Sequence, residues 1–139
     1  MKVKVSEKLD DIKTLLSEIK GVSEEVGAVI IFVGSARGIG NDGGRVLRLE
    51  YDAYEEVAVK TLEKIIGDLR DKYGIIDAVV EHRIGQVNVG EDIVYVLVAS
   101  KHREEGFKAA IEIVERLKRE APIWKKEITD RGARWIENI

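Results

Sequence analysis

The chain contains no cysteine, one proline and only two histidines among its 139 residues. Without cysteine it can form no disulfide, no thiolate metal site and no covalent thiol intermediate of its own. The two histidines, His82 and His102, lie twenty residues apart, which is too far for the two-histidine metal motif of a single helix. Any chemistry at sulfur would therefore need a sulfur atom brought in by another molecule.

The sequence also lacks an excess of basic charge and any long apolar run. Its net charge is −3 and its pI is near 5.5, so no overall positive field is available to attract nucleic acid. The longest apolar stretch, residues 28–33, is far too short to cross a membrane, and the charged start MKVKVSEKLDDIK is unlike a signal peptide. We therefore expect a cytoplasmic protein. The 45% hydrophobic and 35% charged residues are typical of a soluble globular protein, and the length of 139 residues predicts a single domain spanning residues 1–139.

Apolar periodicity predicts three helices separated by pairs of strands. The expected helices are residues 6–20 with Ser6 as N-cap, 55–73 with Gly74 after its end, and 103–119. The expected strands are 27–35, 46–54, 75–84, 92–100, 124–129 and 134–136. This order favours an α+β fold with a mainly antiparallel sheet, because a doubly wound parallel sheet would need strict alternation of strand and helix.

A glycine-rich loop follows the first predicted strand. Residues 34–40, GSARGIG, match the GxxxGxG loop of short-chain dehydrogenases, but such a loop must lead into a helix that holds the pyrophosphate. Here it leads into Asn-Asp-Gly-Gly and then a strand, and no Tyr-x-x-x-Lys pair exists, so nicotinamide binding is not expected. Two interpretations remain: a mobile loop whose Arg37 closes over an anion, or an ordinary hairpin loop with a solvated arginine.

The last third of the chain carries a cluster of lysines. Apolar residues recur along the third predicted helix at spacings of three and four: Phe107, Ala110, Ile111, Val114 and Leu117. Lys118 continues this stripe, and Lys125 and Lys126 follow beyond Pro122. Clustered, partly buried ammonium groups lower one another's pKa, which suits a lysine to nucleophilic or proton-transfer chemistry near neutral pH. The alternative is a frayed helix end with solvated lysines.

Other candidate residues have competing interpretations too. Residues 100–103, SKHR, stand at a predicted strand-to-helix junction, where amides and basic side chains suit a phosphate or carboxylate or simply face water. We interpret His82 as structural, since it lies within a predicted strand. Trp124 and Trp135 are expected to anchor the terminal strands in the core.

Taken together, these residues resemble the large, catalytic subunit of molybdopterin synthase, the MoaE family. The resemblance extends from about Val3 to Glu137. It rests on FVG with Arg37, on LEY and AYE in residues 49–55, on HRIG with VGE in residues 82–91, and on His102-Arg103 with Phe107. It continues through Leu117-Lys118 to the run PIWKKE at residues 122–127, which is highly specific in combination with the rest.

The resemblance implies an α/β-hammerhead fold and an enzyme that converts cyclic pyranopterin monophosphate to molybdopterin. Two dithiolene sulfurs would come from the thiocarboxylated Gly-Gly end of a small ubiquitin-like subunit, bound at each end of a central homodimer to give a heterotetramer. No resident cofactor, metal, nucleic acid or membrane is implied. The catalytic residues would be Lys118 and Lys125, and the substrate site would comprise Ser35, Ala36, Arg37, His102, Arg103, Lys118, Lys125, Lys126 and Glu127. A dimeric scaffold that captures a Gly-Gly tail without catalysis is the alternative function.

Two further expectations follow. The loop at residues 38–44 is longer and richer in glycine than is usual in the family, so its contacts are not transferred from relatives. Arg103 and Lys118 lie on one predicted helix, roughly 22 Å apart at about 1.5 Å per residue. One small substrate cannot easily touch both in one chain, so we expect His102 and Arg103 to come from the other protomer.

Overall fold

The computed structural model describes residues 1–136; the last three residues of the expected domain, 137–139, lie outside the described part. Within residues 1–136 the fold consists of two four-stranded sheets and three helices. The elements in chain order are β1 (Lys2–Ser6), α1 (Ile12–Lys20), β2 (Ala28–Ser35), β3 (Val46–Ala53), α2 (Glu55–Tyr73), β4 (Asp77–Arg83), β5 (Gly85–Val87), β6 (Asp92–Ser100), α3 (Arg103–Glu120), β7 (Ile123–Thr129) and β8 (Gly132–Ile136). This is the predicted α+β class.

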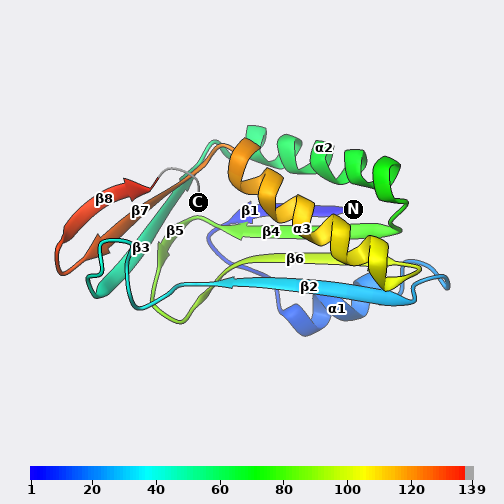
Figure 1. The fold of residues 1–139 in the computed structure, drawn as a ribbon, viewed down its shortest axis with the longest axis horizontal. Helices are drawn as coiled ribbons and strands as arrows, with labels where there is room; N and C mark the ends of the chain where they lie inside the picture. Colours follow the sequence, from blue (N-terminus) through cyan, green and yellow to red (C-terminus); the bar gives the residue numbers. More distant parts are fainter. Residues whose placement is uncertain (137–139) are drawn as a thin grey trace.

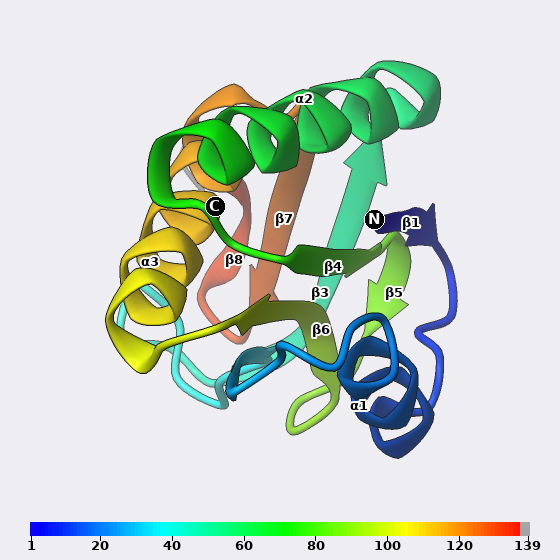
Figure 2. The same cartoon turned by 90° about the vertical axis from the view of Figure 1, so that its right-hand side faces the viewer.

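The first sheet has the strand order β1-β4-β6-β2. Its pairs are antiparallel except β1 with β4, which run parallel. Helices α2 and α3 cover one face of this sheet and α1 covers the other (Figures 1 and 2). Strand β6 contributes side chains to both of these helix–sheet interfaces, because successive side chains of a strand point to opposite faces. Val94, Val96 and Val98 belong to the core under α2 and α3, whereas Tyr95, Leu97 and Ala99 pack with α1.

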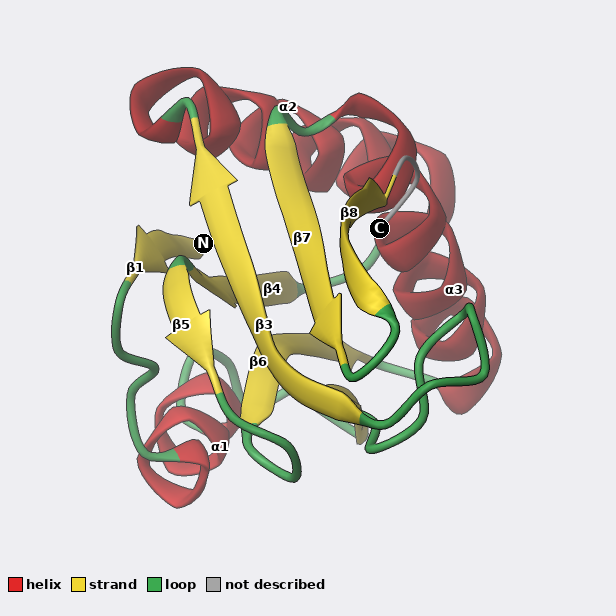
Figure 3. Cartoon of the chain, turned by 90° about the vertical axis from the view of Figure 1, so that its left-hand side faces the viewer, coloured by secondary structure: helices red, strands yellow, loops and turns green. Residues whose placement is uncertain are grey.

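The second sheet has the order β5-β3-β7-β8, and all its pairs are antiparallel. It stands at one end of the first sheet, where β3 leads into α2 and β7 follows α3 (Figure 3). Leu49, Tyr51, Val87 and Ile123 are buried on its inner side as part of the larger core. The junction between the two sheets and the end of α3 therefore brings together segments from most of the chain.

Several boundaries agree with the sequence-based prediction. Helix α2 and strand β6 have the predicted bounds. Gly74 follows α2 in the left-handed conformation, with φ at 67°, as expected of the residue after a helix end. No helix within residues 1–136 has both the length and the apolar character needed to cross a membrane.

The secondary structure predicted for the first residues of the chain is wrong. Ser6 lies in β1, and the first helix begins six residues later, at Ile12. Its N-cap is Asp11, whose carboxylate accepts a hydrogen bond from the backbone N–H of Thr14 at 3.1 Å. Strand β1 escaped prediction because it alternates lysine and valine only briefly before the helical pattern begins. The short β5, within the predicted turn at residues 85–90, was also missed.

The predicted buried face of α3 is shifted around the helix. The buried positions include Gly106, Ala110, Ile113 and Leu117, whereas Phe107 and Ile111 are 52% and 60% exposed. Small residues lie inward because α3 packs closely on the sheet: a Cβ at Gly106 would come 2.6 Å from the Ser100 hydroxyl. The larger apolar residues thus form an exposed stripe beside the buried one.

The two tryptophans are not core anchors. Trp124 is 49% exposed and Trp135 is 59% exposed, on strands β7 and β8 of the second sheet. The core of this sheet is made by residues of the opposite face, including Ile123 and Leu49.

Candidate functional site

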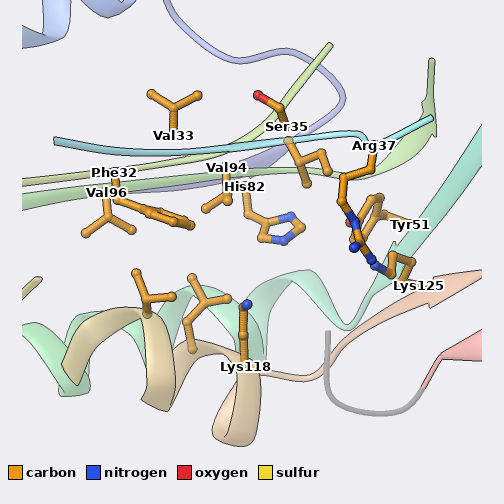
Figure 4. A pocket seen from close by; sticks show the side chains of 14 residues that line it. Phe32, Val33, Ser35, Arg37, Tyr51, His82, Val94, Val96, Lys118 and Lys125 are labelled. Atoms are coloured by element: carbon orange, nitrogen blue, oxygen red, sulfur yellow. The ribbon is translucent and has the colours of Figure 1, made fainter. Parts of the chain in front are cut away.

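A cavity of about 370 Å³ lies where the two sheets meet the C-terminal end of α3. Strand β2, Arg37 in the loop after it, strands β3, β4, β6 and β7, and the last turns of α3 all contribute to its wall (Figure 4). This volume is within the range of pockets for small ligands. Its lining residues are Phe32, Val33, Gly34, Ser35, Arg37, Tyr51, His82, Ile93, Val94, Val96, Val114, Leu117, Lys118 and Lys125.

Four of the predicted site residues line this cavity together: Ser35, Arg37, Lys118 and Lys125. Lys118 comes from the last turn of α3 and is exposed, and its side chain extends toward the wall that carries His82 (Figure 4). Arg37 and Lys125 reach the cavity from the neighbouring wall (Figure 4). Three side chains that can only donate hydrogen bonds and carry positive charge thus face one small volume, an arrangement suited to an anion.

Lys125 is the most perturbed of these cations. It stands on β7 directly across from Tyr51 of β3 and is half-buried. Burial lowers the pKa of the Lys125 ammonium below its ordinary value. The charges of Arg37 and Lys118 lower this pKa further, and the carboxylate of Glu127 acts in the opposite direction. Of the three lysines in the predicted cluster, Lys118 and Lys125 therefore act on one another in the structure, and Arg37 rather than Lys126 is the third cation.

Arg37 is held in place by the glycine-rich loop. Its guanidinium donates to the side-chain oxygen of Asn41 at 3.0 Å. The backbone N–H of Asn41 in turn donates to Glu127 Oε1 at 2.9 Å. The loop, for which the sequence left both a mobile and an ordinary hairpin form open, is therefore tied to β7 by its own backbone.

Asp42 provides a second attachment of the same loop. Its carboxylate accepts the N–H of Gly44 at 2.7 Å and the hydroxyl of Thr129 at 2.8 Å, and these bonds lower its pKa. Gly40 approaches Glu127 so closely that a Cβ there would collide with the carboxylate. The glycines serve this close packing of loop against strand.

Lys126 and Glu127 do not line the cavity. Because side chains alternate along β7, Lys126 lies on the outer face, across from Glu50, with its Nζ 5.8 Å from the centre of the Trp135 ring. Glu127 faces inward but is only 2% exposed, beneath the glycine-rich loop. Ala36 is also buried, with its backbone bonded to Glu91 and Gly90.

His102 and Arg103 lie elsewhere, at the N-terminal end of α3. They line a separate hollow of about 590 Å³ together with residues that include Gly27 and Lys101. The Glu105 carboxylate accepts the backbone N–H of His102, so the helix start is capped while both basic side chains remain exposed. The opposite ends of α3 thus carry the two groups of predicted site residues.

Tyr51 and His82 line the cavity but were not among the predicted site residues. Their rings meet edge to face, with centroids 5.1 Å apart. Burial raises the pKa of Tyr51 and lowers that of His82 to about 4. The alternation of β4 places His82 on the same face as Ala78 and Val80, and this periodicity was the available signal that it lies on the side of α3.

The cavity can bind and polarise an anionic molecule and can exchange protons with it through lysine. Within residues 1–136 no group of three or more histidine or acidic side chains is arranged to hold a metal ion.

Comparison with known proteins gives consistent results. The sequence profile of the family described as "MoaE protein" matches residues 5–120. The chain is 44% identical over 115 residues to the molybdopterin synthase catalytic subunit of Pyrococcus abyssi, a match that covers 83% of this chain and 77% of that protein. The crystal structure of molybdopterin synthase from Staphylococcus aureus superposes with a TM-score of 0.83 at 34% identity, covering 96% of this chain and 94% of the other.

A complex of subunits 1 and 2 of the molybdopterin-converting factor from Helicobacter pylori contains a chain with the same fold. It superposes with a TM-score of 0.77 at 23% identity and covers 97% of this chain and 90% of that one. At this identity the likeness concerns the fold alone.

Proposed function

The chain belongs to the MoaE family, and we propose that it is the catalytic subunit of a molybdopterin synthase, converting cyclic pyranopterin monophosphate to molybdopterin with sulfur from a small partner subunit. The observation that carries this proposal is the convergence of Arg37, Lys118 and Lys125 on one cavity. These residues come from three separate segments, and nothing in the core requires their charges there.

Arg37 is proposed to bind the phosphate of the substrate through charge-assisted hydrogen bonds. Opening the cyclic phosphate and adding sulfur both move negative charge, which Lys118 and Lys125 can neutralise. Because its pKa is lowered, Lys125 holds a larger neutral fraction near neutral pH than an ordinary lysine does. It is therefore suited to accept a proton, while Lys118 at the cavity mouth meets the incoming sulfur donor.

His102 and Arg103 are proposed to complete the site from a second copy of the chain. Helix α3 has Arg103 at its start and Lys118 in its last turn, and its exposed apolar residues Phe107 and Ile111 lie between them. A twofold axis passing near Ile111 would set α3 of one copy antiparallel to α3 of the other. Arg103 of each copy would then lie beside Lys118 of its partner, and the exposed apolar stripe would be covered.

The sulfur is proposed to arrive as a thiocarboxylate on the C-terminal Gly-Gly of a small ubiquitin-like subunit. The chain has no cysteine, so it cannot hold a persulfide or thiolate intermediate itself. A tail of two glycines is narrow enough to enter the cavity where bulkier side chains would not fit.

The test supplies the purified chain and the pterin precursor with three sulfur sources. The thiocarboxylated partner should support molybdopterin formation, whereas free sulfide should be far slower and a partner trimmed of its last two glycines should be inactive. Equal rates with the trimmed partner would contradict the threading of the tail. Binding of the intact partner without any turnover would favour the non-catalytic scaffold.

A further inference from the structure

His82 is the polar side chain of the cavity whose presence the fold does not explain. Its side chain is 3% exposed, and it stands on β4 between core positions and the cavity. A histidine whose two ring nitrogens are both bonded within the core would be structural. Among residues 1–136, the structure gives a hydrogen-bond partner to only one of the two nitrogens of His82.

The paired nitrogen determines the tautomer. His82 Nδ1 lies 2.7 Å from the backbone carbonyl oxygen of Arg83. A carbonyl can only accept, so Nδ1 carries the proton and donates it. Nε2 is then left with a lone pair, and within residues 1–136 it has no hydrogen-bond partner. The imidazole remains in this neutral form because burial lowers its pKa to about 4.

The Nε2 atom faces the cavity that Arg37, Lys118 and Lys125 also line (Figure 4). The ring stands between Tyr51 and the wall formed by β6, across the cavity from Lys118 (Figure 4). Arg37 and Lys118, and Lys125 while it is protonated, can only donate hydrogen bonds, whereas neutral Lys125 and the hydroxyls of Ser35 and Tyr51 can donate or accept. Among the described residues that line this cavity, His82 alone presents a side-chain atom restricted to accepting.

We infer that His82 Nε2 accepts a hydrogen bond from an N–H group of the heterocyclic substrate and thereby determines the orientation in which the ring enters the cavity. This inference rests on the proposed function, since a reduced pterin carries N–H donors on its ring as well as a phosphate. The cations recognise the phosphate, and His82 recognises the ring. An anion without such donors, such as inorganic phosphate, gains nothing from His82.

Two substitutions separate the roles of the two ring nitrogens. In His82→Asn the side-chain amide can still donate to the Arg83 carbonyl, but no atom reaches the position of Nε2. In His82→Gln the longer side chain can place its carbonyl oxygen near that position. Thermal unfolding of both variants establishes that they are folded.

Calorimetry should show that His82→Asn weakens binding of the pterin precursor about tenfold, the loss expected for one buried hydrogen bond. His82→Gln should remain within about threefold of the unsubstituted chain, and the affinity for inorganic phosphate should be unchanged in both. Unchanged pterin affinity in a folded His82→Asn variant would overturn the inference, as would an equal loss of pterin and phosphate affinity. Because this readout needs no turnover, failure of the proposed reaction would be a separate result.

Discussion

At the scale of single residues, the site depends on placing positive charge where burial opposes it. Lys125 is the clearest case, because the desolvation of its ammonium and the neighbouring Arg37 and Lys118 all disfavour the charged form. Among the described residues, the carboxylate of Glu127 is the group that favours the charged form. A side chain kept in such surroundings reduces the stability of the fold, and this gives a test independent of activity.

Replacing Lys125 with methionine should stabilise the protein at neutral pH while strongly impairing molybdopterin formation. Methionine keeps an unbranched apolar stem but removes the charge that burial penalises. We expect the unfolding midpoint to rise by about 2–5 °C, as roughly 1 kcal/mol produces in a domain of this size. Differential scanning calorimetry measures it, and Lys108→Met, at an exposed position on α3, is the matched control.

The difference in stability between Lys125→Met and the unsubstituted protein should depend on pH, because the fold lowers the pKa of Lys125. Below the lowered pKa of Lys125, the folded and unfolded states are both protonated and the folded state carries the penalty. Between that pKa and the ordinary value of 10.5, the unfolded state binds more protons, so stability due to Lys125 rises with pH. The advantage of Lys125→Met should therefore shrink at high pH; a constant advantage would contradict the shift.

At the scale of elements, the alternation of β7 sorts the run PIWKKE into two faces. Lys125 faces the cavity, Lys126 faces outward beside Trp135, and Glu127 is buried under the glycine-rich loop. The contact between Glu127 and the N–H of Asn41 links this strand to the loop that carries Arg37. We therefore interpret Glu127 as a residue that positions Arg37.

Substitutions of Glu127 distinguish positioning from direct contact. Glu127→Gln retains an oxygen that can accept the Asn41 N–H, whereas Glu127→Ala leaves that N–H unpaired. We expect KM for the pterin precursor to rise about tenfold in the alanine variant and only slightly in the glutamine variant. Steady-state kinetics provides the comparison, and equal defects would indicate that the carboxylate charge itself contacts the substrate.

Periodicity in the sequence was sufficient for α2, β6 and the overall class, because long apolar patterns with clear end signals determine such elements. Apolar spacing alone predicts the buried stripe of α3, and it is right for Ala110 and Leu117 but wrong for Phe107 and Ile111. Phe107 and Ile111 are large but exposed, while Gly106 lies against the sheet where only a small residue fits. Local patterns cannot report how closely two elements approach each other.

The sequence also allowed part of the candidate site to be predicted. Lys118 and Lys125 were identified from their spacing around Pro122 and from the family resemblance, and the fold brings both to one cavity. His82 is interpreted as structural in the sequence because it lies within a predicted strand, and only the tertiary structure shows that, among residues 1–136, one of its ring nitrogens is left unpaired. The separation of His102 and Arg103 from the lysines followed from helix length alone.

At the scale of the whole molecule, the two ends of α3 contribute to two hollows, and these remain separate within one chain. His102 and Arg103 line one hollow, and Lys118 lines the other. The exposed apolar residues between them include Phe107 and Ile111. Two copies related by a twofold axis would bury these residues and build two composite sites.

Mixing two inactive variants tests this arrangement. A dimer of one Lys118→Ala chain and one Arg103→Ala chain would contain one intact composite site and one doubly substituted site. Because half of the dimers in an equal mixture are hybrids, we expect about a quarter of the unsubstituted activity to return. Turnover before and after subunit exchange measures it. No recovery, with exchange shown independently by mass spectrometry, would place the whole site within one chain.

The central claim is that the lysines of the cavity carry out the chemistry, and Lys118→Ala tests it most directly. The measurement is the single-turnover rate of molybdopterin formation with saturating pterin precursor and thiocarboxylated partner, compared with Lys108→Ala on the same helix. We predict a loss of about 10²–10⁴-fold for Lys118→Ala, with folding and partner binding intact, and no loss for Lys108→Ala. A Lys118→Ala protein that forms molybdopterin at a near-normal rate would contradict the account.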